Sequence, residues 1–333
     1  MRGFLGLVFF MPGIKGLKGN PDGVIIYHYK NESDFEKTKN HNGVRDWMKK
    51  TCPKTGLLPL GGLAAGALAG WIAWGNTALV LTTYTLSSGK LPRQFSGCRI
   101  AQISDLHNAQ LGNGNQKLLG ILKRAKPDLI AITGDLIDSR RTDLPAALDF
   151  AAEAGKIAPC YYVPGNHEAR VPEYGRLKAG LEDRGIVVLT DEAVTIPRAG
   201  AEITLLGVED PSFQTRDLRG RAKDLMRSKL QGLTGTEAPY TILLSHRPEL
   251  FPVYQEQGVD LVLSGHTHGG QFRLPWVGGL LAPGQGLHPK YDGGCYTQGA
   301  TTMVVSRGIG NSLFPFRFNN RPEVVLVRLK QAP

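Results

Sequence analysis

The chain is predicted to be an α/β protein with at least partly parallel sheets, because short apolar runs alternate with amphipathic stretches. Five of these apolar runs are bounded by turn residues, which is the pattern of buried strands. Each run is followed within three residues by Asp, Asn or His. The expected strands cover residues 98–104, 128–133, 160–163, 240–245 and 260–264.

Amphipathic stretches between these runs predict the helices that connect the strands. Residues 115–124 place Leu118, Leu119, Ile121 and Leu122 at helical spacing. Similar patterns are expected to form helices over residues 144–154, 173–184 and 249–257, and residues 79–86 are expected to form the first strand of the domain.

Metal-binding residue types stand at the ends of the five expected strands. Ligands gather at the carboxyl ends of strands in such folds, so five strand ends are expected to build one site. The candidates are two Asp, one Asn and four His, namely Asp105, His107, Asp135, Asn166, His246, His266 and His268. A lone Asp or Asn after a strand is usually a turn former or a helix cap. That alternative must hold at all five places at once, so the pattern favours two adjacent metal ions.

The motifs that carry these residues resemble those of the calcineurin-like metallophosphoesterases. They are Asp105-x-His107, Gly134-Asp135, Gly165-Asn166-His167-Glu168, His246 and Gly265-His266-x-His268. The resemblance spans residues 94–329, and residues 265–271 and 307–324 are most similar to the branch of small bacterial, membrane-associated phosphoesterases. It implies a four-layer α/β/β/α sandwich of two mixed sheets, with a dinuclear metal site at the carboxyl ends of strands.

The resemblance also implies how the ligands are shared between two divalent ions. One ion would be held by Asp105, His107, Asp135 and His268, and the other by Asp135, Asn166, His246 and His266. This set of oxygen and imidazole ligands suits Mn, Fe or Zn. A bridging Asp135 would hold the ions about 3.5–4 Å apart, close enough for both to contact one phosphate. A metal-bridging hydroxide is then the expected nucleophile.

The resemblance assigns a catalytic role to His167, as general acid or transition-state stabiliser. The alternative is that His167 only orients Asn166. Glu168 stands where Asp is commoner in the family, and we interpret it as a marker of the branch. Arg247, Gln271 and Arg317 are candidate substrate contacts, with structural roles as the alternative, and Arg321 carries the same ambiguity.

The amino-terminal part predicts attachment to a membrane. Residues 55–89 contain no charged side chain, and residues 57–74 approach the minimum length of a bilayer span, with Trp71 and Trp74 at an interface. Lysines at positions 49, 50 and 54 precede this segment. We therefore expect residues 48–75 to be a single-pass signal anchor in a bacterial cytoplasmic membrane, with the catalytic domain extracytoplasmic. A cleavable signal peptide ending at Ala67-Leu68-Ala69 is the alternative.

The remaining parts of the chain complete the expected domain organisation. Residues 76–333 are expected to form the metallophosphoesterase domain. Residues 1–47 show no strong periodicity, and we interpret them as a disordered tail or a non-native extension of a protein that begins at Met48. Amino-terminal sequencing of the native protein checks this, because residues found before Met48 would contradict the non-native extension.

Charge and cysteine usage exclude other classes of protein. Of the net charge of +10, residues up to Lys54 contribute +5, from ten Lys or Arg against five Asp or Glu, so the rest of the chain is only mildly basic. Basic residues do not form runs interleaved with aromatics, which argues against dedicated nucleic-acid binding. The four cysteines form no CxxC pair.

These observations predict metal-dependent hydrolysis of a phosphate ester, either a phosphodiester or a phosphomonoester. The substrate would be a phosphorylated small molecule or a phospholipid, and the expected membrane segment favours a lipid-linked ester. Cleavage of the pyrophosphate of a nucleotide-linked lipid precursor is an alternative, although it needs a cytoplasmic site. A non-catalytic binding protein on the same fold is the other alternative. The sequence leaves the natural substrate and the oligomeric state open.

Overall fold

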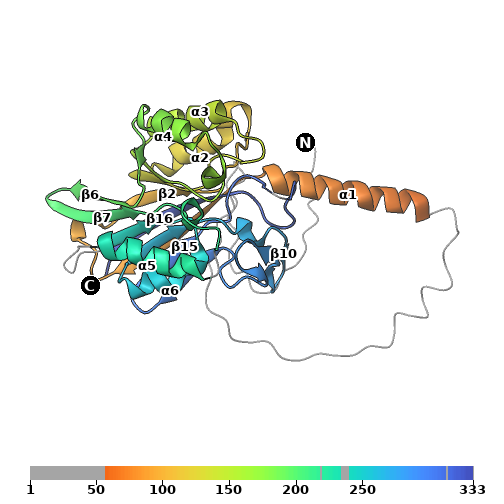
Figure 1. The fold of residues 1–333 in the computed structure, drawn as a ribbon. Helices are drawn as coiled ribbons and strands as arrows, with labels where there is room; N and C mark the ends of the chain where they lie inside the picture. The colour runs from red at the N-terminus through yellow and green to blue at the C-terminus, as the bar shows by residue number, and fades with distance from the viewer. Residues whose placement is uncertain (1–56, 218–219, 234–239, 313, 333) are drawn as a thin grey trace, which may run out of the picture.

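Two six-stranded mixed sheets form the centre of the molecule (Figure 1). A computed structural model describes residues 57–217, 220–233, 240–312 and 314–332. The mixed α/β architecture expected from the sequence is confirmed. The expectations for residues 1–47, including a start at Met48, lie outside the described residues.

The first sheet combines the two ends of the domain with four parallel strands. Across the sheet the order is β1 (Val80–Ser88), β16 (Glu323–Gln331), β2 (Arg99–Ile103), β3 (Leu129–Thr133), β4 (Cys160–Val163) and β5 (Val187–Val188). Strands β2 to β5 run parallel, β16 is antiparallel to β2, and β1 is parallel to β16. The last strand of the chain therefore lies between β1 and the strands that lead to the expected metal ligands.

The second sheet packs face to face against the first. Its order is β14 (Gly294–Gln298), β15 (Thr301–Val305), β9 (Leu261–Ser264), β8 (Thr241–Leu244), β7 (Ala201–Gly207) and β6 (Glu192–Arg198). Strands β15, β9, β8 and β7 run parallel, and an antiparallel strand flanks them on each side. The two sheets thus bring two sets of parallel strand ends together.

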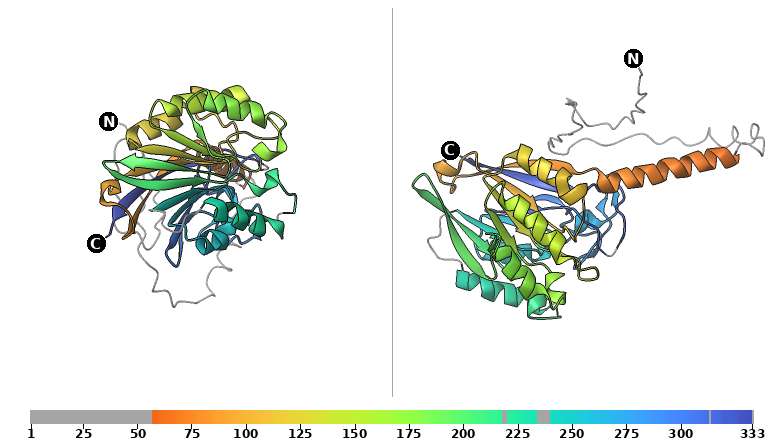
Figure 2. Two further views of the ribbon diagram at one scale, coloured as in Figure 1. Left: turned by 60° about the vertical axis from the view of Figure 1, so that its left-hand side comes forward. Right: turned by 90° about the horizontal axis from the view of Figure 1, so that it is seen from above.

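Helices cover the outer faces of both sheets (Figure 1, Figure 2). The first sheet is covered by α2 (Gln116–Ala125), α3 (Leu144–Gly155) and α4 (Tyr174–Glu182), and the second by α5 (Arg221–Leu233) and α6 (Phe251–Glu256). Single 3-10 turns occur at Arg93–Phe95, Asn113–Asn115, Glu168–Arg170, Pro211–Phe213, Pro248–Leu250 and His268–Gly270. Each sheet is therefore buried on both faces.

Burial on both faces explains why these strands are continuously apolar in the sequence. In β3, Ile130 and Ile132 pack against the helices, whereas Ala131 points into the core between the sheets. In β9, Leu263 points into the same central core and Val262 packs toward α5 and α6. Because successive side chains point to opposite faces of a strand, two cores fix each strand and hold its carboxyl end in place.

Residues 272–290, which come between β9 and β14 in the chain, form a small lobe. It contains two antiparallel pairs, β10 (Arg273–Leu274) with β11 (Gly278–Gly279), and β12 (Leu281–Ala282) with β13 (Gly286–Leu287). We call residues 272–290 the apolar lobe, because its tips carry exposed Trp, Leu and Val side chains.

Helix α1 (Leu57–Thr77) projects from the domain at the end opposite the β6–β7 hairpin (Figure 1, Figure 2). Across the described residues, none of the helices combines the length and the apolar character needed to cross a membrane. The spanning helix expected over residues 57–74 is therefore not supported.

Candidate metal centre

Seven buried polar side chains gather where strands of the two sheets end. All lie in the loops that follow β2, β3 and β4 of the first sheet and β8 and β9 of the second. They are Asp105, His107, Asp135, Asn166, His246, His266 and His268, the residues predicted as metal ligands. Because β2, β3 and β4 are parallel neighbours, as are β8 and β9, their carboxyl ends meet at one edge. The structure thus brings all seven candidates together.

Asp105, His107 and His268 form a first group of candidate ligands. Their ligand atoms all lie within 4.8 Å of one another. The Nε2 atoms of His107 and His268 are 3.1 Å apart, and Asp105 Oδ1 lies 3.5 Å from His268 Nε2. Two imidazole nitrogens and a carboxylate oxygen therefore point at one position.

Asp135, His246 and His266 form a second group within the same 4.8 Å limit. His246 Nε2 lies 3.2 Å from Asp135 Oδ2 and 3.2 Å from His266 Nδ1. The same Oδ2 atom lies 3.7 Å from Nε2 of His107, which belongs to the first group. Asp135 therefore stands between the two groups, where a bridging ligand is needed.

The residues present fit two metal ions. Asn166 Oδ1 is buried and has no hydrogen-bond partner, although a buried amide oxygen normally has one. Facing imidazole nitrogens are also hard to satisfy with hydrogen bonds alone, whereas one cation satisfies several lone pairs at once. Carboxylate, amide and imidazole ligands together suit Mn, Fe or Zn, and the identity of the ions stays open.

Burial and neighbouring charge set the protonation of these groups. Burial lowers the pKa of His107 and of His268 to about 3, and burial with the nearby Arg247 also lowers the pKa of His266. Burial alone would raise the pKa of Asp135, but His246 and its neighbours hold that pKa well below its usual range. His107, His266 and His268 are therefore neutral imidazoles and Asp135 is an ionised carboxylate, which are the protonation states that bind metals.

His246 differs from the other histidines because it faces two carboxylates. Burial lowers its pKa, but Asp135 and then Asp105 raise it to about 10. Its Nδ1 atom lies 2.8 Å from Thr133 O and donates to it, so Nε2 is the atom that faces Asp135. Such a backbone contact fixes the ring orientation of a metal-binding histidine.

Glu168 holds together the two loops that follow β3 and β4. Its carboxylate accepts three backbone N–H groups, from Asp135 at 3.0 Å, Ile137 at 3.1 Å and Gly165 at 2.7 Å. These groups belong to the loops after β3 and β4, so one side chain joins the segments that carry Asp135 and Asn166. Sequence analysis treated Glu168 only as a marker of a branch, and the structure shows it to be a positioning residue.

The ligand loops adopt backbone conformations that are rare for residues with side chains. Five of the seven candidates have positive φ, namely Asp105, His107, Asp135, His266 and His268. Gly134 has φ of 92°, and a Cβ there would lie 2.5 Å from His246 Nδ1. Glycine at position 134 therefore lets the β3 loop lie against the ring of a ligand from the other sheet.

His167 faces the opening of the site with a defined tautomer. Its Nδ1 atom accepts a hydrogen bond from the backbone N–H of Ser139 at 3.0 Å, so the ring proton of the neutral form is on Nε2. Nε2 lies 3.2 Å from Ser312 Oγ. Burial lowers the pKa of His167, which favours this neutral form. His167 therefore presents an N–H donor next to the candidate ligands.

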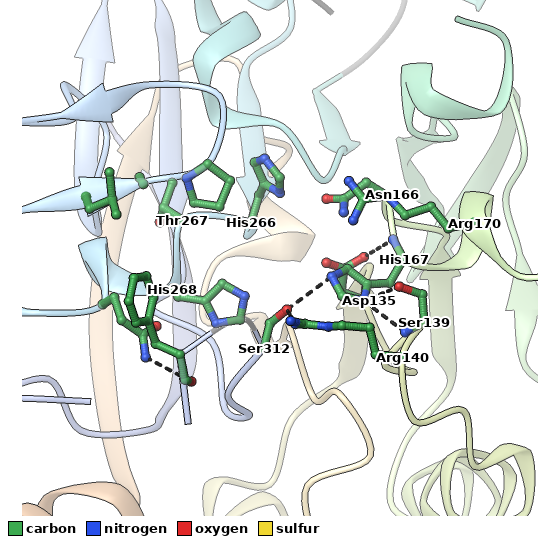
Figure 3. Close-up of a pocket in the computed structure, with 15 residues that line it drawn as sticks. Asp135, Ser139, Arg140, Asn166, His167, Arg170, His266, Thr267, His268 and Ser312 are labelled. Atoms are coloured by element: carbon green, nitrogen blue, oxygen red, sulfur yellow. Dashed lines mark hydrogen bonds between the residues drawn. The ribbon is translucent and has the colours of Figure 1, made fainter. Parts of the chain in front are cut away.

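A cavity of about 550 Å³ opens onto the site. In Figure 3, His266 and His268 lie across from Asp135, Asn166 and His167, with Ser312 between them. Its lining also includes residues that sequence analysis missed, namely Ser139, Arg140, Arg170, Thr267, Leu281, Ala282, Pro283, Ser312 and Phe314. Arg140 and Arg170 follow Asp135 and Asn166 by only a few residues. Their closeness in sequence to predicted metal ligands was the signal that could have identified them.

The three predicted substrate contacts lie in different settings. Gln271 lines the cavity, and its Nε2 donates to Phe316 O at 2.6 Å. Arg247 is buried, pairs with Asp210 at 2.6 Å, and lies 3.3 Å from His266 Nε2. Arg317 is also buried, with Nη2 3.4 Å from His268 Nδ1. In this structure the two arginines contact ligand histidines, and contact with substrate stays a prediction for all three.

Arg321, which carried the same ambiguity, contacts the amino-terminal segment. Its Nε donates to Ala78 O at 2.7 Å, and its guanidinium lies 4.6 Å from the centre of the Trp74 ring.

A dinuclear ligand set at the strand ends of two packed mixed sheets defines a metal-dependent phosphoesterase. The family model described as calcineurin-like phosphoesterase matches residues 98–270. This match includes all seven candidate ligands and covers about half of the chain. The chain belongs to this family, and it is a hydrolase that acts on phosphoester bonds.

Relatives occur in bacteria and in vertebrates. The chain is 31% identical over 285 residues to the uncharacterized metallophosphoesterase YkuE of Bacillus subtilis, which covers 83% of this chain and 94% of YkuE. It is 31% identical over 208 residues to phosphodiesterase YaeI of Escherichia coli, covering 61% of this chain and 71% of YaeI. A transmembrane protein with metallophosphoesterase domain from Danio rerio is 31% identical over 252 residues, covering 73% of this chain and 55% of that protein.

Among solved structures, TT1561 of Thermus thermophilus matches 64% of this chain and 91% of its own. The TM-score is 0.46 and the sequence identity is 15%.

Replacing Glu168 with Gln should weaken metal binding by about 10- to 100-fold, because an amide NH₂ group would face backbone N–H donors. Isothermal titration with Mn²⁺ measures the effect. Glu153→Gln is the matched control, since Glu153 lies on the surface and pairs only with Lys156. Equal affinity in the two variants would show that Glu168 does not position the ligands.

Proposed function

We propose that the enzyme hydrolyses a phosphodiester or phosphomonoester that carries an apolar group, such as a phospholipid. The composition of the cavity wall supports this proposal. Arg140 and Arg170, from the loops after β3 and β4, supply positive charge beside the ligand groups. Leu281 and Ala282 of the apolar lobe, together with Phe314, supply apolar surface. A phosphate would lie near the arginines, and its apolar substituent would lie against the lobe.

Two bound metal ions would polarise the phosphate and lower the pKa of a bound water, which supplies the nucleophile. Asp135 would be shared between the ions, with Asp105, His107 and His268 on one side and Asn166, His246 and His266 on the other. The site has only two carboxylates among its ligands, so two divalent ions would leave it positively charged and able to attract a phosphate anion.

His167 and the arginines would act on the substrate directly. The Nε2–H group of His167 would donate a hydrogen bond to an oxygen of the reacting phosphate. The Ser139 backbone N–H donates a hydrogen bond to Nδ1, which disfavours a second ring proton. We therefore infer that His167 acts as a neutral donor. Stabilisation of the transition state is therefore favoured over proton transfer from an imidazolium.

His167→Ala should lower kcat/KM by about 10²- to 10⁴-fold, whereas His167→Gln should recover part of this loss because its amide keeps a donor. Turnover of bis-nitrophenyl phosphate by the metal-loaded full-length protein measures both effects. His288→Ala is the control, since His288 is exposed on the apolar lobe. Equal losses in the Ala and Gln variants, with wild-type activity that falls as the pH rises through the pKa of His167, would instead identify an imidazolium acid.

The apolar wall predicts a dependence on substrate length. In a series of phosphodiesters with lengthening alkyl groups, kcat/KM should rise by roughly fourfold for each methylene that becomes buried. Phe314→Ser should flatten this series and leave the shortest diester unchanged. Mono- and diesters should be compared after loading with Mn, Fe or Zn. If chain length has no effect, the substrate is a soluble phosphoester, and preference for a nucleotide-linked pyrophosphate would favour the alternative activity.

We also propose that the catalytic domain acts outside the cytoplasm. The lysines at positions 49, 50 and 54, followed by a charge-free segment, support export of the domain. A reporter enzyme that works only outside the cytoplasm should be active when it is fused after Pro333. Activity of a strictly cytoplasmic reporter would reverse this topology.

A further inference from the structure

The apolar lobe exposes large apolar side chains to an unusual degree. Trp276 is 95% exposed at the turn between β10 and β11, and Leu287 in β13 is 73% exposed. Leu274 and Val277 are also exposed beside Trp276. Single exposed apolar residues are common, but several of them within one short lobe mark an interaction surface.

The charge of the lobe is entirely positive. Residues 272–290 contain Arg273 and Lys290 and no Asp or Glu. Arg273 pairs with Asp292 at 2.9 Å, so Lys290 carries the free positive charge of the lobe. Lys290 is exposed and lies 5.0 Å from the centre of the Tyr291 ring. A tip with Trp and Leu beside basic groups matches the interface of a bilayer that contains anionic lipids, where aromatic and basic side chains are both stabilised.

The lobe is joined to α1 through the loop that lines the cavity. Phe272 of the lobe contacts the rings of Phe314 and Phe316 at 5.4 and 5.6 Å. The same loop is tied to the end of α1, because Asn76 Oδ1 accepts hydrogen bonds from Arg317 N at 2.7 Å and Asn311 Nδ2 at 3.1 Å. Both α1 and β10 lie at one end of the molecule (Figure 1).

Helix α1 adds a second exposed apolar surface at this end. Leu63, Leu68, Trp71 and Trp74 are exposed, and α1 contains no charged residue. A protruding turn and a projecting helix do not form one flat face, so a rigid protein partner would need matching contours for both. A fluid bilayer adapts to both shapes.

We propose that the apolar lobe inserts its tip into the surface of a lipid bilayer, with Trp276 and Leu287 as the inserted side chains. This surface is separate from α1 and does not require a spanning segment. Leu281 and Ala282 continue from the lobe into the cavity wall. If the proposed function holds, as this step requires, a lipid phosphoester would reach the metal centre along the lobe.

Binding of the full-length protein to vesicles tests the insertion. Vesicles of phosphatidylglycerol and phosphatidylethanolamine should bind the wild type, and Trp276→Ser combined with Leu287→Ser should lower the partition coefficient by about tenfold or more. The matched control is Val187→Ser, which removes an exposed apolar side chain from β5. Unchanged partitioning of the double variant, together with no contact between Trp276 and lipid in the next measurement, would overturn the proposal.

A second measurement reports contact of the lobe itself, even if α1 dominates binding. The chain has four tryptophans, so replacing Trp47, Trp71 and Trp74 with Phe leaves Trp276 as the only one. Its fluorescence should be quenched by vesicles that carry doxyl-labelled lipid, and absence of quenching would overturn the insertion. If the protein chains associate with one another through the lobe and do not contact lipid, quenching would also be absent.

The two proposals can fail independently. Trp276 and Leu287 do not line the cavity, so the double variant should hydrolyse bis-nitrophenyl phosphate at the wild-type rate without vesicles. Loss of vesicle binding with this rate intact supports the docking surface. Wild type that binds vesicles through Trp276 but cleaves no phosphoester would reject the proposed function and leave the docking surface standing.

Discussion

The structure depends on one buried carboxylate, that of Asp135, which lies between histidines from both sheets. An ionised carboxylate in a protein interior costs several kcal/mol unless positive charge and hydrogen bonds compensate for it. Asp135 Oδ1 accepts the His167 backbone N–H at 2.8 Å, and Oδ2 faces His246 at 3.2 Å. The contact with His246 crosses from the first sheet to the second, so the central core must hold the strand ends in register for Asp135 to be tolerated.

The loops around Asp135 are costly by themselves and persist because their neighbours hold them. Each non-glycine residue in the left-handed region costs on the order of 1–3 kcal/mol, and five of the candidate ligands are of this kind. Glu168 offsets part of this cost by accepting three backbone N–H groups. The strands that lead into these loops are buried on both faces, which leaves the loops few alternative conformations.

The sequence could predict the strands that lead to the site, because β2, β3, β4, β8 and β9 are mostly apolar and are followed by ligand residue types. It could not predict contacts between loops far apart in the chain. Arg247 looked available to substrate, yet its guanidinium meets Asp210, whose loop follows β7 in a part of the chain that carried no motif. The β6–β7 hairpin, α5 and the pairing of β16 between β1 and β2 were also missed, because partly exposed strands and distant pairings leave weak local signals.

The amino-terminal helix shows that a local pattern can predict an element without predicting its contacts. A charge-free segment predicted a helix over residues 57–74, and α1 is that helix, but none of the described helices is long and apolar enough to cross a membrane. What the pattern could not show is where α1 ends. Asn76 binds the backbone of Arg317, and the Arg317 guanidinium lies 3.4 Å from His268. The direction of α1 is thereby fixed relative to a metal ligand, so whatever surface α1 meets also sets the orientation of the metal centre.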